Sequence, residues 1–183
     1  MRMTADDDTL ARQASNGDRD AFAALLERHY DRIWRIGLRL LGNADDAADL
    51  TQEVCVSLAG KMASYRGDSR FTTWLYRVVV NAARDAMRRH ATRRRANEGY
   101  ADVSALVEAG DAARQSEVRW LYEALGALKD DLRETAVLVL QEELSHAETG
   151  AILGVKEATV SWRMHEVRKK LKGLAEAGEE FSP

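Results

Sequence analysis

The sequence predicts an all-α protein made of two small helical domains joined by a flexible linker. Three observations support this fold class. Proline occurs only at the terminal Pro183, so nothing interrupts long helical patterns. Strand-like alternation of apolar and polar residues, bounded by turn signals, is hard to find. Finally, 183 residues with 45% hydrophobic content can bury one core of ordinary size or two small ones.

Three helices are expected in the first part of the chain. Apolar residues recur on helical spacing over 20–41, between an Asn-Gly and a Gly-Asn turn signal. A second helix is expected over 44–60, with acidic residues in its first turn, where the helix dipole favours them. A polar loop follows over 61–70. The third helix covers 70–95.

Positive charge is concentrated in this third helix, although the chain carries a formal net charge of −3. Residues 1–60 hold seven basic and eleven acidic side chains, a balance of −4, whereas 70–95 hold eight arginines against one aspartate. One stripe of the helix is apolar, and the opposite stripe is expected to face solvent. That polar stripe comprises Arg77, Asn81, Arg84 and Arg88. A charge run is most often a solvated face, but this composition also suits nucleic-acid binding.

Aromatic residues lie beside the polar loop that precedes the basic helix. Trp74 falls on the apolar stripe and is expected to be a core anchor. Phe71 and Tyr76 are expected to be better placed to touch a base, because unstacked bases are held by aromatic rings beside phosphate-binding arginines.

The second expected helix carries a polar face with several carboxylates. The residues concerned are Asp45, Asp49, Gln52 and Glu53. Paired carboxylates can do acid–base work, but neither a nucleophile nor an apolar pocket signal accompanies them. The face is therefore interpreted as a solubility surface or as a docking patch for a basic partner. One cysteine, Cys55, and four scattered histidines give no metal-ligand spacing, so no metal, cofactor or catalytic residue is expected.

The second part of the chain shows the punctuation of a helix-turn-helix. Apolar periodicity fades over 96–115, which is interpreted as the linker, and it returns at Val118. A short helix is expected to end at Gly154, and a longer one to resume near Glu157. The end of the chain, AEAGEEFSP, is acidic and is expected to fray.

The longer helix separates an apolar stripe from a polar and basic one. Val160, Met164 and Val167 are expected to pack inward. The side chains expected to stay available are Thr159, Ser161, Trp162, Arg163, His165 and Lys169. Among these, the Arg163 guanidinium is expected to reach a guanine in a major groove, and Lys169 to neutralise a phosphate. An ordinary helical hairpin with a solvated basic end is the alternative.

Motifs in both parts of the chain resemble those of one family. GDRDAF, LGNADDAADLTQEV and TTWLYRVVVNAARD occur in that order, followed by LKDDLRETAVLVL and LSHAETGAILGVKEATVSWRMHEVRKKL. With these motifs, the chain resembles an extracytoplasmic-function sigma factor, the smallest group in the sigma-70 family of bacterial RNA polymerase initiation factors. The first three motifs are similar to region two of that family, and the last two to region four.

The resemblance implies a division of labour along the chain. Residues 1–95 would dock on polymerase and melt the −10 element, 96–115 would be the linker, 116–175 would bind the −35 element, and 176–183 would be an acidic tail. The implied polymerase-docking residues are Asp49, Gln52 and Glu53. The implied −10 residues are Arg70, Phe71, Tyr76, Arg77, Asn81, Arg84 and Arg88, with the loop over 64–70. The implied −35 residues are Thr159, Ser161, Trp162, Arg163, His165, Arg168 and Lys169.

The expected partners are core RNA polymerase, promoter DNA and an anti-sigma factor, and no enzymatic activity is expected. The N-terminus lacks the apolar core of a signal peptide, and no apolar run is long enough to span a bilayer, so we expect a cytoplasmic protein without membrane insertion. Two other function classes compete with this hypothesis. One is a stand-alone helix-turn-helix regulator that occupies an operator without melting it. The other, a hydrolase using the carboxylates near residue 49, lacks a nucleophile or metal set.

Overall fold

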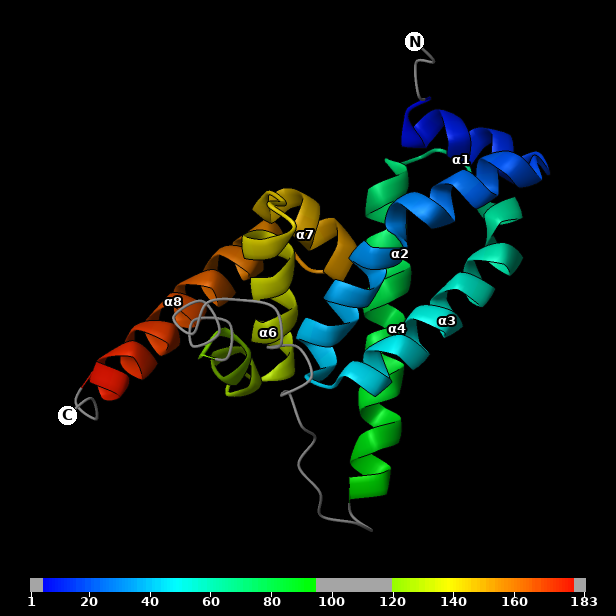
Figure 1. Ribbon diagram of the computed structural model, residues 1–183. Helices are drawn as coiled ribbons and strands as arrows, with labels where there is room; N and C mark the ends of the chain where they lie inside the picture. The colour runs from blue at the N-terminus through cyan, green and yellow to red at the C-terminus, as the bar shows by residue number, and fades with distance from the viewer. Residues whose placement is uncertain (1–4, 95–119, 180–183) are drawn as a thin grey trace. The chain divides into compact units, whose positions relative to one another are not determined.

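The structure of the protein, a computed structural model, describes the backbone of residues 5–94 and 120–179, and the side chains of 5–89 and 120–176 (Figure 1). Every regular element in these described ranges is helical, which confirms the all-α prediction. The chain divides into two compact units, one on either side of residues 95–119. The predicted linker lies outside the described residues.

The first unit contains the three predicted helices in order, with two additions: a helix at the N-terminus and a short 3₁₀ helix in the predicted loop over 61–70. The elements are α1 (Asp7–Ser15), α2 (Arg19–Leu41), α3 (Ala44–Lys61), the 3₁₀ helix η1 (Met62–Ser64) and α4 (Phe71–Arg94). Helix α1 was not predicted. It is short, and the Asp6 carboxylate caps it by accepting a hydrogen bond of 2.7 Å from the Thr9 backbone N–H.

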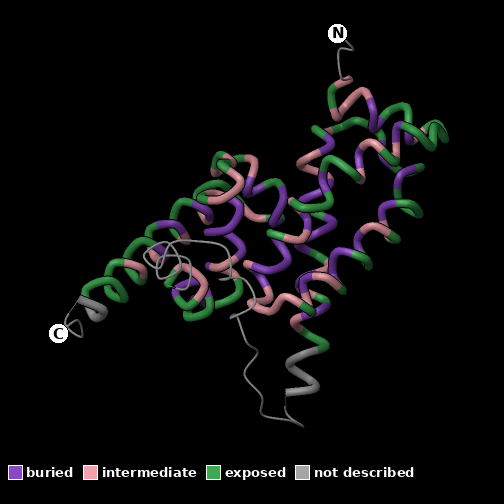
Figure 2. Tube along the Cα trace, in the orientation of Figure 1, coloured by how far each residue is buried: buried purple, intermediate pink, exposed green. Residues whose placement is uncertain are grey.

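Buried residues of the first unit alternate with exposed ones along its helices (Figure 2), and on α4 the buried residues are not confined to one stripe. Leu75 and Val79 are fully buried, as their place on the apolar stripe predicts. Val80 and Ala83, which the stripe does not include, are buried as well. The reason is that α1 and α2 both pack on α4 and cover more of its circumference than one stripe.

The second unit begins with a helical segment over 120–126 and continues through a helix-turn-helix. Its other elements are α6 (Asp130–Ala136), a π-helical turn η3 (Val137–Gln141), α7 (His146–Leu153) and α8 (Glu157–Glu179). The Arg133 guanidinium joins two of these elements by donating hydrogen bonds to the carbonyls of Leu125 and Leu128, at 2.8 and 2.9 Å. Leu125 lies in the last turn of the segment over 120–126 and Leu128 just after it, where carbonyls have no next helical turn of N–H groups to accept from.

Local signals mark both ends of α7 and the turn that leads to α8. Ser145 and Glu148 form a capping box that begins α7, and Gly154 ends it in the left-handed conformation at φ 72°. Gly150 permits the close approach of the chain after the turn, since a Cβ there would lie 2.7 Å from the Val155 carbonyl oxygen. The predicted helix-turn-helix is present with its expected boundaries.

Helix α8 is longer than expected. The sequence places the start of a fraying tail just after Leu174, whereas the helix runs to Glu179. The segment AEAGE contains alanine and glutamate, which are strong helix formers, and no proline stops the helix. Residues 180–183 lie outside the described part.

Candidate nucleic-acid interface

The loop before α4 is tied down at its base and exposed at its tip. The Tyr65 hydroxyl donates a hydrogen bond of 2.9 Å to the Ser69 carbonyl oxygen, which closes the loop. Gly67 has φ 76°, a conformation that glycine adopts without strain. The tip residues Arg66, Gly67 and Asp68 are all exposed. The loop is therefore held at its base and presents charged side chains to solvent.

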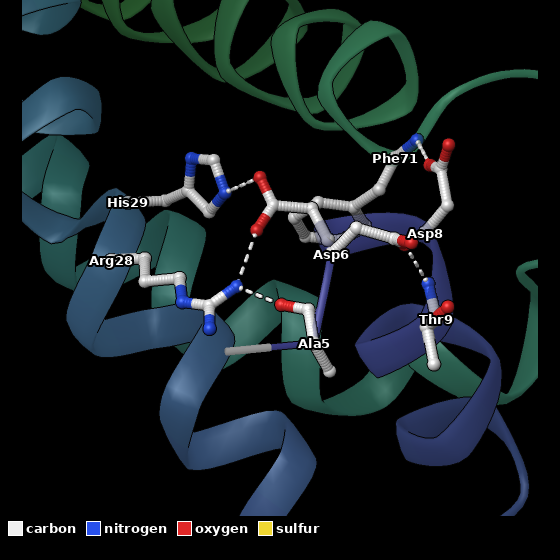
Figure 3. A network of polar contacts seen from close by, with 8 residues as sticks. Ala5, Asp6, Asp8, Thr9, Arg28, His29 and Phe71 are labelled. Atoms are coloured by element: carbon white, nitrogen blue, oxygen red, sulfur yellow. Dashed lines mark hydrogen bonds and ion pairs between the residues drawn. The ribbon is translucent and has the colours of Figure 1, made fainter. Parts of the chain in front are cut away.

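Asp8 of α1 anchors the first residue of α4 across 63 positions of sequence. The Phe71 backbone N–H donates a hydrogen bond of 2.6 Å to Asp8 Oδ1 (Figure 3). This N–H is one of the four at the start of a helix that have no partner inside the helix. A carboxylate at this place also lies favourably in the field of the helix dipole. Asp8 therefore fixes where the exposed loop ends and the basic helix begins.

Asp7, the residue before Asp8, links α1 to α2. The Asp7 carboxylate lies 3.0 Å from Arg28 Nη1 and 2.8 Å from His29 Nε2, and Arg28 also donates to the Ala5 carbonyl at 2.7 Å (Figure 3). Two effects oppose each other at His29. Burial lowers the pKa of its imidazole and Asp7 raises it; the burial is the larger effect, so the pKa lies below the ordinary value of 6.5.

The basic face predicted on α4 is exposed. Arg70 lies in the loop, and Arg77, Asn81 and Arg88 lie on the helix with side chains that reach solvent, while Arg84 is half-buried. Asp85 interrupts the face and pairs with Arg88. Asn81 thus stands as an exposed amide between guanidinium groups, in the arrangement that the sequence predicts.

The expectation that Phe71 and Tyr76 can touch a base was wrong, whereas Trp74 is half-buried and packs against the rings of Tyr65 and Phe71. Phe71 and Tyr76 are only 2% and 3% exposed, so neither is presented to a base, and Trp74 is the more exposed of the three. Phe71 packs between Tyr65 and His29, with ring centroids 6.1 and 5.4 Å away. The contacts that bury Phe71 come from α2 and from the chain after η1, and a helical stripe within α4 cannot reveal them.

The acidic face of α3 is exposed and carries an apolar residue that the sequence did not single out. Asp49, Gln52 and Glu53 are all exposed, as is Val56, whose exposed fraction of 75% is large for a valine. Val56 follows Gln52 by four positions and therefore lies on the same face. Glu53 has an internal partner, because Arg89 of α4 donates to it at 2.7 Å. An apolar residue among acceptors suits a docking surface better than a purely solvated one.

Helix α8 turns its apolar stripe inward and its polar stripe outward. Val160, Met164 and Val167 are fully buried, as predicted. Of the predicted set, Thr159 is half-buried, and five residues are exposed: Ser161, Trp162, His165, Arg168 and Lys169.

Arg163 does not stay available, and here the prediction was wrong. Its side chain is only 15% exposed, and its Nε lies 3.5 Å from Asp131 Oδ2 of α6. The guanidinium therefore joins α8 to α6 and is not extended toward a groove. The neighbouring Ser161 hydroxyl is also engaged, at 2.9 Å from His146 Nδ1 of α7.

The described residues hold neither a metal-binding cluster nor a membrane-spanning helix. In that part of the chain, no group of three or more His, Cys, Asp or Glu side chains could hold a metal ion. Within the same ranges, no helix is both long enough and apolar enough to cross a membrane.

Comparison with known protein families assigns both units. Residues 25–93 match the family model described as Sigma-70 region 2, and residues 118–171 match Sigma-70, region 4. The chain is 31% identical over 172 residues to the ECF RNA polymerase sigma factor SigW of Bacillus subtilis, covering 88% of this chain and 92% of that protein. It is 34% identical over 161 residues to the RNA polymerase sigma factor CarQ of Myxococcus xanthus, covering 87% and 91%.

Solved structures give the same fold. CnrH, solved in complex with the cytosolic domain of CnrY, matches with a TM-score of 0.73 and 28% identity, over 93% of this chain and 97% of CnrH. The sigma factor RpoE of Bartonella quintana, solved in complex with the anti-sigma factor NepR, matches with a TM-score of 0.71 and 22% identity, over 85% and 96%.

Proposed function

Because the chain belongs to the extracytoplasmic-function group of the sigma-70 family of RNA polymerase sigma factors, we propose that its two units divide the recognition of one promoter between them. The first unit, within residues 1–95, binds core polymerase through α3 and opens the −10 element with α4 and the preceding loop. The second, within 116–175, places α8 in the major groove of the −35 element. Residues 96–115 connect the two. A stand-alone regulator is set aside, because both regions of a sigma factor are matched in order.

The observation that carries the proposal for the first unit is the held loop beside an exposed amide and basic face. Opening a duplex requires that a base leave the stack and be contacted on its edges, while cations neutralise the backbone. Asn81 can donate to and accept from a base edge, whereas Arg77 and Arg88 provide positive charge for phosphate. Phe71 and Tyr76 act from below the surface by holding this helix in place, since both are buried.

For polymerase binding, we assign the exposed face of α3. Asp49, Gln52 and Glu53 offer acceptors and an amide, and Val56 adds apolar area that is buried only when a partner covers it. Glu53 also pairs with Arg89, which links the docking face to the basic helix. Binding of α3 to polymerase would thereby also position the −10 surface on α4, which belongs to the same unit.

For the −35 element, we assign the exposed residues of α8. Arg168 and Lys169 lie in the middle of the helix and supply phosphate contacts, while Trp162 and His165 lie nearer its N-terminus, the part of a recognition helix that meets base edges. Arg163 acts indirectly by holding α8 on α6 through Asp131.

The protein works as a binding factor in the cytoplasm, where its polymerase acts, and not as an enzyme. We further propose that a partner holds it inactive, as an anti-sigma factor would. Support comes from CnrH, a structural relative that was solved with a cytosolic partner domain bound to it. The exposed face of α3 around Val56 is a suitable binding surface for such an inhibitor. The inhibitor and core polymerase would compete for it, because only one of them can cover this face at a time.

The test for the −10 surface compares Asn81→Ala with Asn16→Ala, an exposed asparagine at the end of α1. Open-complex formation is measured by permanganate reactivity on promoters varied at each −10 position. Asn81→Ala is expected to reduce opening and to relax preference at one position, because an amide bidentate to a base is worth about 1–3 kcal/mol of discrimination. Asn16→Ala should behave as the parent. A uniform loss on every variant would instead assign Asn81 to backbone contact.

A further inference from the structure

Helix α8 presents an exposed tryptophan where a guanine-reading arginine was expected. Trp162 is 59% exposed, although a buried place is usual for such a large side chain. The adjacent Arg163, which was expected to reach a base, is only 15% exposed and is turned toward Asp131. The chemistry offered to a groove at this point of the helix is therefore mainly apolar.

The surroundings of Trp162 favour DNA as its partner. Ala158, Trp162, His165 and Lys169 are spaced by four, three and four positions, so they share one face of α8, and all four are exposed. The face changes from a small side chain at its N-terminal end to a cation about three turns later, and Arg168 and Lys170 add positive charge beside that cation. A polyanion matches this gradient better than an apolar protein surface does.

In the major groove, the one apolar group on the base edges is the C5 methyl of thymine. From these observations we infer that Trp162 is a specificity-determining residue that contacts a thymine methyl in the −35 element. The preference at that position is therefore for an A·T pair, with the thymine on a defined strand. This inference rests on the proposed function and names the base that α8 selects.

The test removes only the methyl group. The probe is the promoter fragment that gives the strongest run-off transcript with the holoenzyme, with each thymine of its −35 element replaced in turn by uracil. Uracil pairs with adenine as thymine does. With the parent protein, one substitution is expected to weaken holoenzyme binding about fourfold, which corresponds to about 0.8 kcal/mol for one carbon group withdrawn from an apolar contact.

Three variants separate a methyl contact from other roles. Trp162→Ala should bind thymine and uracil promoters equally, because the partner of the methyl is gone. Trp162→Phe should retain the discrimination, since a phenyl ring keeps the apolar contact without the indole N–H. Trp120→Ala is the matched control: Trp120 is also exposed, at 41%, in the same unit but outside the helix-turn-helix, and its loss should leave the fourfold effect unchanged.

The outcomes are distinguishable. If the parent shows no uracil effect at any A·T pair, or if Trp162→Ala retains the full effect, the inference is overturned, and Trp162 is then available for a protein partner. A preferred −35 element without an A·T pair overturns it as well. If the holoenzyme yields no promoter-specific transcript at all, the proposed function itself fails. Melting of Trp162→Ala by far-UV circular dichroism should match the parent, because the replaced side chain is exposed.

Discussion

The bond between Asp8 and α4 is the contact in the first unit whose removal has the most readily calculated effect. Asp8→Ala leaves the Phe71 N–H without its acceptor at 2.6 Å. Loss of a helix cap costs about 0.5–2 kcal/mol, and a hydrogen bond to a charged group contributes about 1.5–3 kcal/mol. Since this bond is part-buried, we expect a loss of about 1.5–2 kcal/mol. For a domain of roughly 90 residues, this lowers the melting temperature by roughly 6–16 °C.

The assay must report on the first unit alone. The chain has four tryptophans, of which Trp34 and Trp74 lie in the first unit and Trp120 and Trp162 in the second. Replacing the latter two by phenylalanine makes intrinsic fluorescence a probe of the first unit during thermal unfolding. Asp31→Ala serves as the matched control, since Asp31 is exposed in the middle of α2, and it should leave the transition nearly unchanged.

A neutral variant separates the acceptor from the charge. Asp8→Asn keeps an oxygen that can accept from the Phe71 N–H, so it should lose less stability than Asp8→Ala. If Asp8→Ala instead unfolds within about 2 °C of the parent, the bond contributes nothing measurable. The claim that α1 fixes the start of α4 is then refuted.

The remaining predictions concern the turn, the buried histidine and the docking face. Gly150→Ala should destabilise the second unit by about 1–3 kcal/mol, because its Cβ would meet a backbone carbonyl at 2.7 Å. Gly173→Ala in α8 meets no neighbouring atom and should stabilise the helix slightly. Chemical unfolding followed by the fluorescence of Trp120 and Trp162 compares the two variants. Because burial lowers the pKa of His29, the unfolded chain binds a proton at a higher pH than the folded protein does. The stability of the first unit should therefore be highest above pH 6.5 and fall as the pH drops toward the pKa of the folded state. His29→Gln should flatten this part of the plot of stability against pH. Val56→Asp should weaken pull-down of core polymerase without shifting the melting temperature. If the variant pulls down as much polymerase as the parent does, polymerase does not bind the Val56 face of α3.

The features that could be predicted from the sequence are those carried by local signals. The glycine at 154 and the acidic start of α3 mark the ends of helices through backbone preferences and the helix dipole, and both were located to within a few residues. Asn81 lies on the exposed face because helical periodicity alone separates it from the core.

The features that could not be predicted depend on contacts between distant segments. Asp8 and Phe71 are 63 positions apart, and a run of three aspartates gives no sign that one of them caps a later helix. From the sequence, Arg163 is an arginine on the polar side of α8, where a base-reading arginine is expected. Its guanidinium instead pairs with Asp131 of α6. Tyr76 is buried because several elements pack on α4, so a single apolar stripe underestimates its buried surface.

The central claim is that one chain directs core polymerase to promoters through two separate DNA-binding units. Run-off transcription with core polymerase on genomic fragments tests it most directly. The account predicts discrete transcripts that require both the protein and the core enzyme, with start sites that share two elements at a fixed spacing. Transcription no different from that of core enzyme alone, together with tight sequence-specific binding of the free protein to duplex DNA, would contradict it.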